Sequence, residues 1–325
     1  MPFEIIPPGT RFDFVGRFRL CAASSLLLML FSAAAIPVRG IRLGVDFAGG
    51  YQVVVRVANA SRADEGGVRA ALVQIGVPSG NVTRLGPASD GLFRVQFATA
   101  DEASPDQLVP LLEAELARTL GETRTESVDF VGPRMGADLR RAALLSLGIS
   151  FLLILAYVAF RFSPTYAPGA VLALIHDVLI TAGVFVLCGW EFDLNVIAAL
   201  LTIVGYSIND TIVIYDRIRE RRERRTSTDL ADVINQSLNE TLSRTILTAG
   251  TTLLAVLALL VLGGPELRGF SAAMTIGIVV GTYSSIYVAS PIMMILERRL
   301  ARPAAAPRAA TPGKRPARRR GAADA

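Results

Sequence analysis

The protein has only two cysteines and one histidine among its 325 residues. Cys21 and Cys188 both lie inside long apolar runs, and two cysteines placed in this way form neither a disulfide framework nor a metal site. The single histidine, His176, excludes a metal site built from several histidines. We therefore expect no bound metal ion.

A nucleotide-binding loop is also lacking. The stretch GGPELRG at 263–269 does not follow the GxxxxGK[ST] pattern whose backbone cradles phosphates. We therefore expect no cofactor, and we expect any energy input to come from something other than a nucleotide bound to this chain. The basic residues behind the net charge of +5 lie mostly in loops and in the tail, where they indicate which side of the membrane each segment faces. The charge therefore gives little support for a nucleic acid as a partner.

Charged residues are scarce in six long stretches of the chain. Hydrophobic residues make up 52% of the sequence, and they are gathered in blocks instead of being spread as in a soluble core. Crossing a hydrocarbon layer of about 30 Å takes about 20 apolar residues, and in lipid such a segment must be a helix. The six runs of this length are 18–38, 139–160, 168–188, 194–216, 245–263 and 270–296.

The first run has some features of a cleavable signal peptide, because basic residues precede it and it contains the small residues SAAA at 32–35. However, Pro37, Arg39 and Arg42 follow without a clear cleavage context, and the apolar stretch is long enough to span a membrane. We interpret it as a retained transmembrane helix.

Arginine and lysine residues in the short loops indicate the orientation. Basic residues precede the first run, cluster at 217–225 between the fourth and fifth runs, and follow the sixth, whereas the loop at 189–193 has none. We therefore predict that both termini are cytoplasmic. Residues 1–17 form the cytoplasmic N-terminus in this prediction, and residues 297–325, rich in Pro, Ala and Arg, form a disordered basic tail.

Residues 39–138 lie between the first two runs, and the topology places them outside, in the periplasm. Their strand-like patterns are at 52–57, 81–86, 92–98 and 123–131, and their helix-like patterns are at 64–76 and 104–121. Ser104 is a suitable N-cap for the second of these helices. The order βαββαβ predicts a ferredoxin-like α+β domain. The predicted fold is thus a six-helix membrane protein with a ferredoxin-like periplasmic domain between helices one and two, and a five-helix bundle over 139–296.

The cytoplasmic loop 217–243 combines the charged stretch RIRERRERR with an amphipathic stretch. The apolar residues on one side of the second stretch are Leu230, Val233, Ile234 and Leu238. We expect the charged half to continue the fourth helix into water, and the amphipathic half to form a surface helix at the membrane interface.

Asp210 is an acid inside the fourth apolar run, where a charge costs about 2.5 to 3.5 kcal/mol on insertion scales. Counted from Leu194 at about 1.5 Å per residue, it lies roughly 24 Å along the helix. The residues that share its helical face are Thr202, Gly205, Tyr206 and Asn209. A polar stripe of this kind is expected to face partner helices or water.

Asp216 and Arg244 lie near the end of the bundle where the fourth helix leaves the membrane. For Asp216 we predict a cap or a surface ion pair with Arg219 or Arg221. Arg244 begins the fifth run at a depth similar to that of Asp210, and its side chain either reaches the lipid headgroups or pairs with Asp210.

His176 and Asp177 are adjacent near the middle of the third run. They form either a hydrogen-bonded pair that fixes helix packing or part of a proton relay, and the same two interpretations hold for Tyr206 and Asn209. A mobile proton suits Asp210, which could load from one side of the membrane and release to the other while Arg244 sets its proton affinity.

Two rival functions remain open at this point. An intramembrane aspartyl protease would use Asp177 and Asp210, but the GxGD motif does not occur. A scaffold without energy coupling would need neither Asp210 nor Arg244.

Four stretches carry a resemblance to a known family: GVDFAGGYQ (44–52), VGYSINDTIVIYDRIRE (204–220), SLNETLSRTILTAGTT (237–252) and GGPELRGFSAAMTIGIVVGTYSSIYVAS (263–290). Over about residues 10–297 the sequence closely resembles the SecD/SecF family of protein-export membrane proteins, within the resistance-nodulation-division superfamily. Its length and its single small outer domain resemble SecF more than SecD, whose outer domain is much larger.

The resemblance implies an accessory subunit of the Sec translocase and not an enzyme. Family members of this kind lie in the bacterial inner membrane and pair with SecD beside the SecYEG channel, together with a YajC-like subunit. They use the proton motive force to complete the translocation of unfolded preproteins that the ATPase SecA has pushed. The remaining contact that we expect is with membrane lipid.

The resemblance also implies roles for single residues. Asp210 and Arg244 match the proton-linked residues of the family, while a third acid belongs to SecD and is absent from this chain. Gly49 and Gly50 would allow the tight turn from the first helix into the outer domain. Asp46 would tie that domain to its base.

Overall fold

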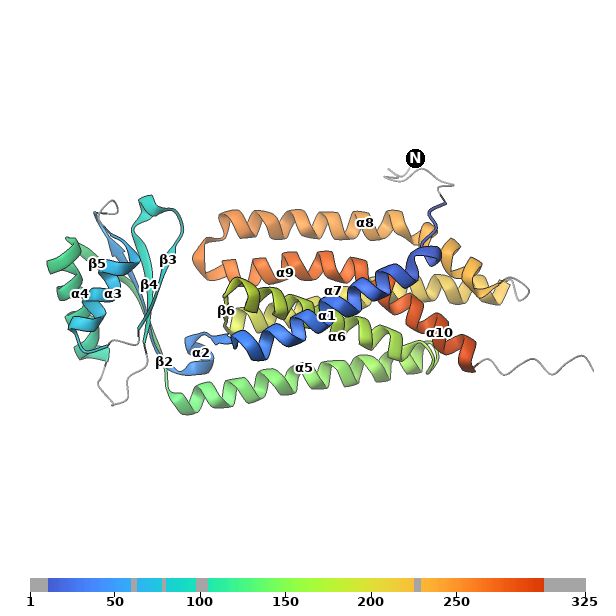
Figure 1. Ribbon diagram of the computed structural model, residues 1–325, viewed down its shortest axis with the longest axis horizontal. Helices are drawn as coiled ribbons and strands as arrows, with labels where there is room; N and C mark the ends of the chain where they lie inside the picture. Colours follow the sequence, from blue (N-terminus) through green and yellow to red (C-terminus); the bar gives the residue numbers. More distant parts are fainter. Residues whose placement is uncertain (1–10, 60–62, 78–79, 98–104, 225–228, 301–325) are drawn as a thin grey trace, which may run out of the picture.

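The computed structural model describes residues 11–59, 63–77, 80–97, 105–224 and 229–300. A small sheet-containing unit, residues 50–131, lies at one end of a long helix bundle, and residues 15–17 and the last helix, α10 (Ser290–Leu300), lie at the other end (Figure 1). We call the end that carries the sheet unit the domain end of the bundle.

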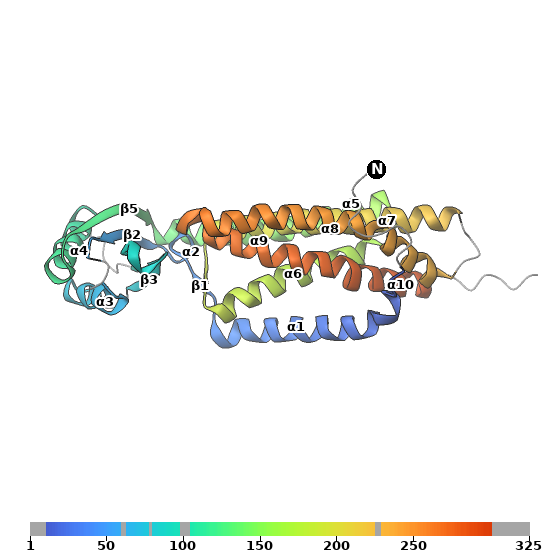
Figure 2. The ribbon, with the colours of Figure 1, turned by 90° about the horizontal axis from the view of Figure 1, so that it is seen from above.

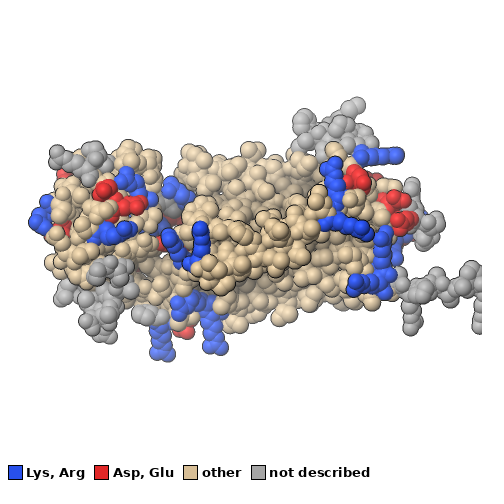
Figure 3. Space-filling model, in the orientation of Figure 1, with Lys and Arg blue, Asp and Glu red and all other residues tan. Residues whose placement is uncertain are grey.

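Six helices in the described part of the chain are long and apolar enough to cross a membrane. They are α1 (Phe18–Arg39), α5 (Pro133–Arg161), α6 (Ala167–Cys188), α7 (Leu194–Arg224), α8 (Leu230–Leu262) and a last one that joins α9 (Gly264–Ser284) to α10 (Ser290–Leu300). On the face shown in Figure 3, charged side chains gather toward both ends of the bundle, and the surface between them carries none. This distribution is typical of a membrane-spanning bundle.

The last helix contains a π-helical turn at Ser285–Ala289 between α9 and α10. Pro291 follows it and has no backbone N–H to complete a regular α-helical ladder. The Ser290 hydroxyl donates to the Ser285 carbonyl (3.0 Å), and the Tyr215 hydroxyl donates to the Ala289 carbonyl (3.1 Å). Carbonyls that the irregular turn frees are therefore satisfied by side chains.

The segment predicted as the loop 217–243 is mainly helical. Helix α7 continues to Arg224, so the charged half extends α7 as expected. Helix α8 already begins at Leu230, so the amphipathic half is the first part of α8, and the prediction of a separate surface helix is wrong. Its apolar residues, Val233, Ile234 and Leu238, are buried in the protein core.

The same part of α8 also holds the N-terminal segment. The Asn239 side chain accepts from the Phe12 N–H (2.7 Å) and donates to the Phe12 carbonyl (2.9 Å), and Asn235 accepts from the Phe14 N–H (2.8 Å). This face is therefore covered by protein, which a helix lying free on the surface would not be.

The sheet unit has the order β2 (Gly50–Val57), α3 (Glu65–Gln74), β3 (Asn81–Leu85), β4 (Leu92–Phe97), α4 (Pro105–Leu120) and β5 (Thr123–Val131). Its four strands are antiparallel in the spatial order β3-β4-β2-β5, and both helices pack on the core of the unit. Strands and helices thus follow each other as the sequence pattern predicted. The predicted N-cap Ser104 and the tail 301–325 lie outside the described residues.

Two short elements connect the sheet unit to the bundle. Strand β1 (Arg42–Leu43) pairs in parallel with β6 (Glu191–Phe192), and the short helix α2 (Val45–Ala48) packs on α5. The Arg140 guanidinium donates to the Phe47 carbonyl at 2.7 Å. Seen from above, α1 lies along one side of the bundle beside α6 (Figure 2).

Candidate functional site

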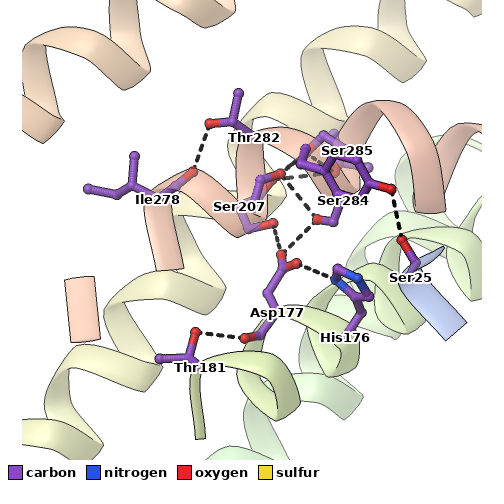
Figure 4. A network of polar contacts seen from close by, with 12 residues as sticks. Ser25, His176, Asp177, Thr181, Ser207, Ile278, Thr282, Ser284 and Ser285 are labelled. Atoms are coloured by element: carbon purple, nitrogen blue, oxygen red, sulfur yellow. Dashed lines mark hydrogen bonds and ion pairs between the residues drawn. The ribbon is translucent and has the colours of Figure 1, made fainter. Parts of the chain in front are cut away.

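Asp177 is the centre of a buried polar network between α6, α7 and α9 (Figure 4). Its Oδ2 atom accepts from Ser207 Oγ (2.6 Å) and from Ser284 Oγ (2.8 Å). Its Oδ1 atom lies 2.9 Å from His176 Nδ1. One carboxylate therefore joins three helices and has a partner at both oxygens.

The network continues toward α1 and along α9. Thr211 Oγ1 donates to Ser285 Oγ (3.0 Å), next to the π-helical turn. The Tyr283 ring stacks on the His176 ring, and its hydroxyl donates to the Cys21 carbonyl of α1 at 2.9 Å. His176 Nε2 is buried without a hydrogen-bond partner among the described residues. Only this atom of the His176–Asp177 pair is left without a partner.

Asp210 has different surroundings. Its side chain is buried (4% exposed), and its Oδ2 atom has no hydrogen-bond partner in the described part of the chain. The Tyr206 hydroxyl on the same helix is also buried. It lies beside the Thr248 and Thr252 hydroxyls of α8, but their geometry does not meet the criteria for a hydrogen bond. A buried carboxylate oxygen without a donor is costly, which distinguishes Asp210 from the fully bonded Asp177.

Arg244 is the charged residue whose electrostatic interaction reaches Asp210. No ion pair forms between them, because no guanidinium nitrogen of Arg244 lies within 4.0 Å of the carboxylate, and Arg244 itself is exposed. The structure thus places the two residues on neighbouring helices, close enough to interact through charge but not in contact. The ion pair between Arg244 and Asp210, which was one of two possibilities from the sequence, is therefore not formed in this structure.

The predicted stripe on α7 is only partly covered. Thr202, Gly205 and Asn209 are exposed, whereas Tyr206 is half-buried and Asp210 is buried. A Cβ atom added at Gly205 would meet no other atom within 4 Å. The stripe therefore borders an open surface of this chain, with Asp210 at its inner edge.

Asp177 and Asp210 do not form a catalytic pair. The contacts of Asp177 are with His176, Ser207 and Ser284, and no hydrogen bond joins it to Asp210. An aspartyl protease requires two carboxylates that share a site. The hydrogen bonds of the described residues show no such shared site for Asp177 and Asp210.

Asp46 lies at the domain end of α7. Its Oδ2 atom accepts from the Leu194 N–H (2.9 Å) at the start of the helix, where free N–H groups favour a carboxylate. Gly49 and Gly50 have φ angles of 77° and 124°, a region that glycine adopts readily and other residues do not. The turn into β2 and the start of α7 are therefore joined through Asp46.

Asp193 is a second acid at this helix start. Its Oδ1 atom accepts from the Val196 N–H at 2.8 Å. Burial raises the pKa of the Asp193 carboxyl, and the neighbouring charge of Asp46 acts in the same direction. Sequence reasoning did not single out Asp193, although an Asp directly before an apolar helix is a usual N-cap signal.

Asp216 is exposed and forms an ion pair with Arg161 at 3.8 Å. The predicted partners form other pairs, since Arg219 bonds to Glu223 and Arg221 bonds to Glu240. The surface ion pair was predicted with the wrong partners, because Arg161 comes from α5, which sequence spacing along α7 cannot show.

Several residues of the polar network were missed from the sequence. Ser207, Ser284 and Ser285 are small polar residues in apolar runs, and serines are common in such helices, so they gave only a weak signal. Among the described residues, no group of three or more His, Cys, Asp or Glu side chains could hold a metal ion.

Comparison with known proteins decides the family. A family model described as protein export membrane protein SecD/SecF, C-terminal, matches residues 112–299, and the SecD/SecF GG motif matches residues 34–60. The protein translocase subunit SecF of Rhodothermus marinus is 42% identical over 301 residues, which cover 90% of this chain and 96% of that one. The chain belongs to the SecD/SecF family.

Other relatives in the family agree. The protein translocase subunit SecF of Rickettsia felis is 38% identical over 299 residues, with 92% of this chain and 96% of the relative covered. The protein translocase subunit SecDF of Thermus thermophilus is 40% identical over 304 residues, and the match covers 91% of this chain but only 40% of that longer one.

The crystal structure of SecDF from Thermus thermophilus, described as a translocon-associated membrane protein, has a TM-score of 0.83 at 39% identity. A second SecDF structure, described as the super-membrane-facing form, has a TM-score of 0.68 at 40% identity. In both cases 92% of this chain is covered, and the chain spans 40% of the solved one. The chain is a multi-pass membrane protein of a protein-export family.

Proposed function

We propose that this chain is a SecF-type subunit that works with a SecD-type partner and uses the proton motive force to complete preprotein translocation through SecYEG after SecA. The observation that carries the proposal is the buried Asp210 carboxylate, which has an oxygen without a donor and feels the charge of Arg244. A carboxylate in this position can gain or lose a proton without breaking a hydrogen bond at that oxygen.

The proposal includes orientation and fold. Both termini face the cytoplasm of a bacterium, the bundle crosses the inner membrane, and the sheet unit is a ferredoxin-like domain in the periplasm. The strand order β3-β4-β2-β5 and the basic residues near the end opposite to the domain support this arrangement. A SecD-type partner is supported by the Thermus relatives, in which a matching segment is part of a longer SecDF chain.

Protonation of Asp210 would remove the negative charge that attracts Arg244, so the balance of forces between α7 and α8 would change with each proton. One elementary charge that moves through the membrane field releases about 2.3 kcal/mol per 100 mV. The other end of α7 is tied to the domain base through the bond from the Leu194 N–H to Asp46 and through the β1–β6 pair. Movement of α7 would therefore be transmitted to the periplasmic domain.

His176 and Asp177 have a supporting role in this scheme. A carboxylate with hydrogen-bond partners on three side chains is held in one position, which suits a fixed packing centre around which α7 can move. Tyr206 lies one helical turn before Asp210 on α7, and its hydroxyl can serve as a proton donor or acceptor for Asp210.

The test is export of a preprotein into membrane vesicles that contain this chain, a SecD-type partner, SecYEG and SecA. Asp210→Asn is expected to abolish the stimulation of export by a proton gradient while the ATP-driven part remains. Asp216→Asn, which changes an exposed acid six residues further along the same helix, is expected to export normally. Full stimulation with Asp210→Asn and with Arg244→Ala would show a scaffold without energy coupling instead.

A further inference from the structure

A cavity of about 300 Å³ lies at the domain end of the bundle, between the ends of α1 and α6. Its lining includes two arginines, Arg39 at the end of α1 and Arg42 in β1, together with Cys188, Gly189 and Trp190. None of these residues has a role in the proton site or in the polar network around Asp177.

Both arginines are held in place by backbone carbonyls. Arg39 Nη1 donates to the Leu187 carbonyl (2.7 Å), and Arg42 Nη1 donates to the Gly189 carbonyl (3.2 Å). A guanidinium carries five N–H donors, so most donors of each arginine remain available. Gly189 has a φ of 69° and lies close to Arg42, where a Cβ atom would come within 3.3 Å of Nη1.

Neither guanidinium is neutralised by an acid. No carboxylate of the described residues lies within 4.0 Å of Arg39 or Arg42, and both side chains are exposed. Glu191, the β6 residue paired with Arg42, uses its carboxylate to accept from Asn81 (2.9 Å) and Gln96 (2.8 Å) of the sheet unit. Two positive charges therefore remain at the rim of one cavity.

The cavity lies where two membrane-spanning helices end, since Arg39 is the last residue of α1 and Cys188 is the last residue of α6. Val38 next to it is 83% exposed on the apolar surface of α1, and Trp190 is 44% exposed. Tryptophan is enriched at the boundary between hydrocarbon and water. A phospholipid headgroup can reach a cavity at the end of such helices from the side.

We propose that this cavity binds the phosphodiester of an anionic phospholipid in the leaflet at the domain end. Arg39 and Arg42 donate to the phosphate oxygens, since the planar guanidinium matches phosphate geometry. Trp190 packs against the glycerol region. The last carbonyls of α6 alone would repel an anion, and the two arginines bonded near them reverse the sign of the local charge.

A bound lipid would link two parts of the chain. Arg39 belongs to a transmembrane helix, whereas Arg42 lies in the strand that pairs with β6 at the base of the sheet unit. Both would donate to the same phosphate. The lipid would therefore restrain the end of α1 relative to the domain base, whether or not Asp210 carries a proton.

The test uses Cys188, which is exposed and lines the cavity. In the variant Cys21→Ser, Cys188 is the only cysteine. The rate at which a water-soluble maleimide modifies Cys188 is measured in two kinds of nanodisc, one of phosphatidylcholine alone and one that also contains phosphatidylglycerol. Phosphatidylglycerol is expected to slow the reaction several-fold. The double variant Arg39→Gln and Arg42→Gln is expected to remove that difference.

Arg134→Gln is the matched control, because Arg134 is an exposed arginine at the same end of the bundle and does not line this cavity. It is expected to keep the lipid effect, which excludes a general effect of surface charge. Equal rates in both kinds of nanodisc, or a lipid effect retained by the double variant, would overturn the proposal. Protection by inorganic phosphate in detergent micelles equal to that by phosphatidylglycerol would overturn the assignment to a lipid.

Discussion

Asp177 and Asp210 are both buried carboxylates in the bundle, and their partners distinguish them. Both oxygens of Asp177 have hydrogen-bond partners, and the residues joined in this way lie on three helices. Asp210 has one oxygen for which the described residues provide no donor, and it has a positive charge nearby on α8. A fully bonded group resists change, whereas an incompletely bonded group can change its protonation at little structural cost.

The donors to Asp177 can be tested one at a time. Ser284→Ala removes one donor from a buried acceptor and is expected to lower the free energy of unfolding by about 1 to 2 kcal/mol. The matched control is Thr282→Val on the same helix, whose hydroxyl bonds among the described residues only to the Ile278 carbonyl of its own helix. Unfolding in mixed micelles gives the free energy of unfolding of both variants. Equal losses in the two variants would contradict the importance of the network.

Asp193 predicts a pH dependence of stability. Burial raises its pKa in the folded protein, so the folded state binds the proton more tightly than the unfolded state does. The charged carboxylate therefore destabilises the fold as the pH rises through this raised pKa. Asparagine can cap the helix without a charge, so Asp193→Asn is expected to raise the melting temperature at neutral pH.

The gain from Asp193→Asn is expected to shrink as the pH falls, because the aspartate then becomes neutral as well. Melting curves recorded across the acidic range check this trend. A gain that stays constant or grows toward low pH would contradict it.

At the residue scale, the sequence was most informative where a residue type is costly. Asp210 stood out because a charge in an apolar run needs a reason, and Gly49 and Gly50 because glycine permits unusual backbone angles. The serine donors did not stand out, since Ser284 lies 107 residues from Asp177 and such spacing carries no periodic signal. Contacts between distant helices follow only from their packing.

At the scale of elements, apolar runs located the six helices but not their lengths. Helix α7 continues past the last apolar residue as a charged extension, because its arginines bond to acids on α7 and α8. Both Arg217 and Arg221 bond to Glu240, which lies one turn before Arg244. A hydropathy window does not register this stabilisation, so it ends the helix too early.

Glycines on α9 set the distance between α9 and α7. A Cβ atom at Gly277 would lie 2.2 Å from the Ile203 side chain, and one at Gly281 would lie 3.1 Å from Ser207. Gly277→Ala is therefore expected to destabilise the protein by about 1 to 3 kcal/mol, the usual cost of overpacking. Gly205→Ala, at a position with no atom within 4 Å, is expected to be neutral or slightly stabilising in the isolated chain.

A second substitution, Ile203→Ala, is expected to reduce the loss of stability caused by Gly277→Ala. Ile203→Ala removes the atoms that a side chain at position 277 would meet, so the double variant is expected to lose less stability than the sum of the single variants. Unfolding in mixed micelles gives the free energy of unfolding of the single and double variants. Additive losses would show that the two helices are not limited by this contact.

At the scale of the whole molecule, the sheet unit is fixed to the bundle by several separate contacts. They are the β1–β6 pair, the bond from the Leu194 N–H to Asp46, the bonds from Asn81 and Gln96 to Glu191, and the ion pair of Arg94 with Glu266 at 3.0 Å. The order of strands and helices along the chain of this unit followed from the sequence pattern. Its attachment did not, because β1 and β6 are two residues each and lie far apart in the sequence.

Glu191→Ala removes one of these attachments. It is expected to cost about 1 kcal/mol, which corresponds to about five-fold faster hydrogen exchange of the β1 and β6 amides. Glu126→Ala is the control, since Glu126 pairs with Arg56 within the same sheet. Unchanged exchange with Glu191→Ala would mean that the other contacts hold the unit without it.

The central claim is that Asp210 binds and releases a proton. Infrared difference spectroscopy of the chain in lipid with its SecD-type partner tests it most directly, through the C=O stretching band of a protonated carboxyl group. The account predicts a band that appears on acidification, is lost in Asp210→Asn and is kept in Asp216→Asn. A band of unchanged intensity in Asp210→Asn would contradict it.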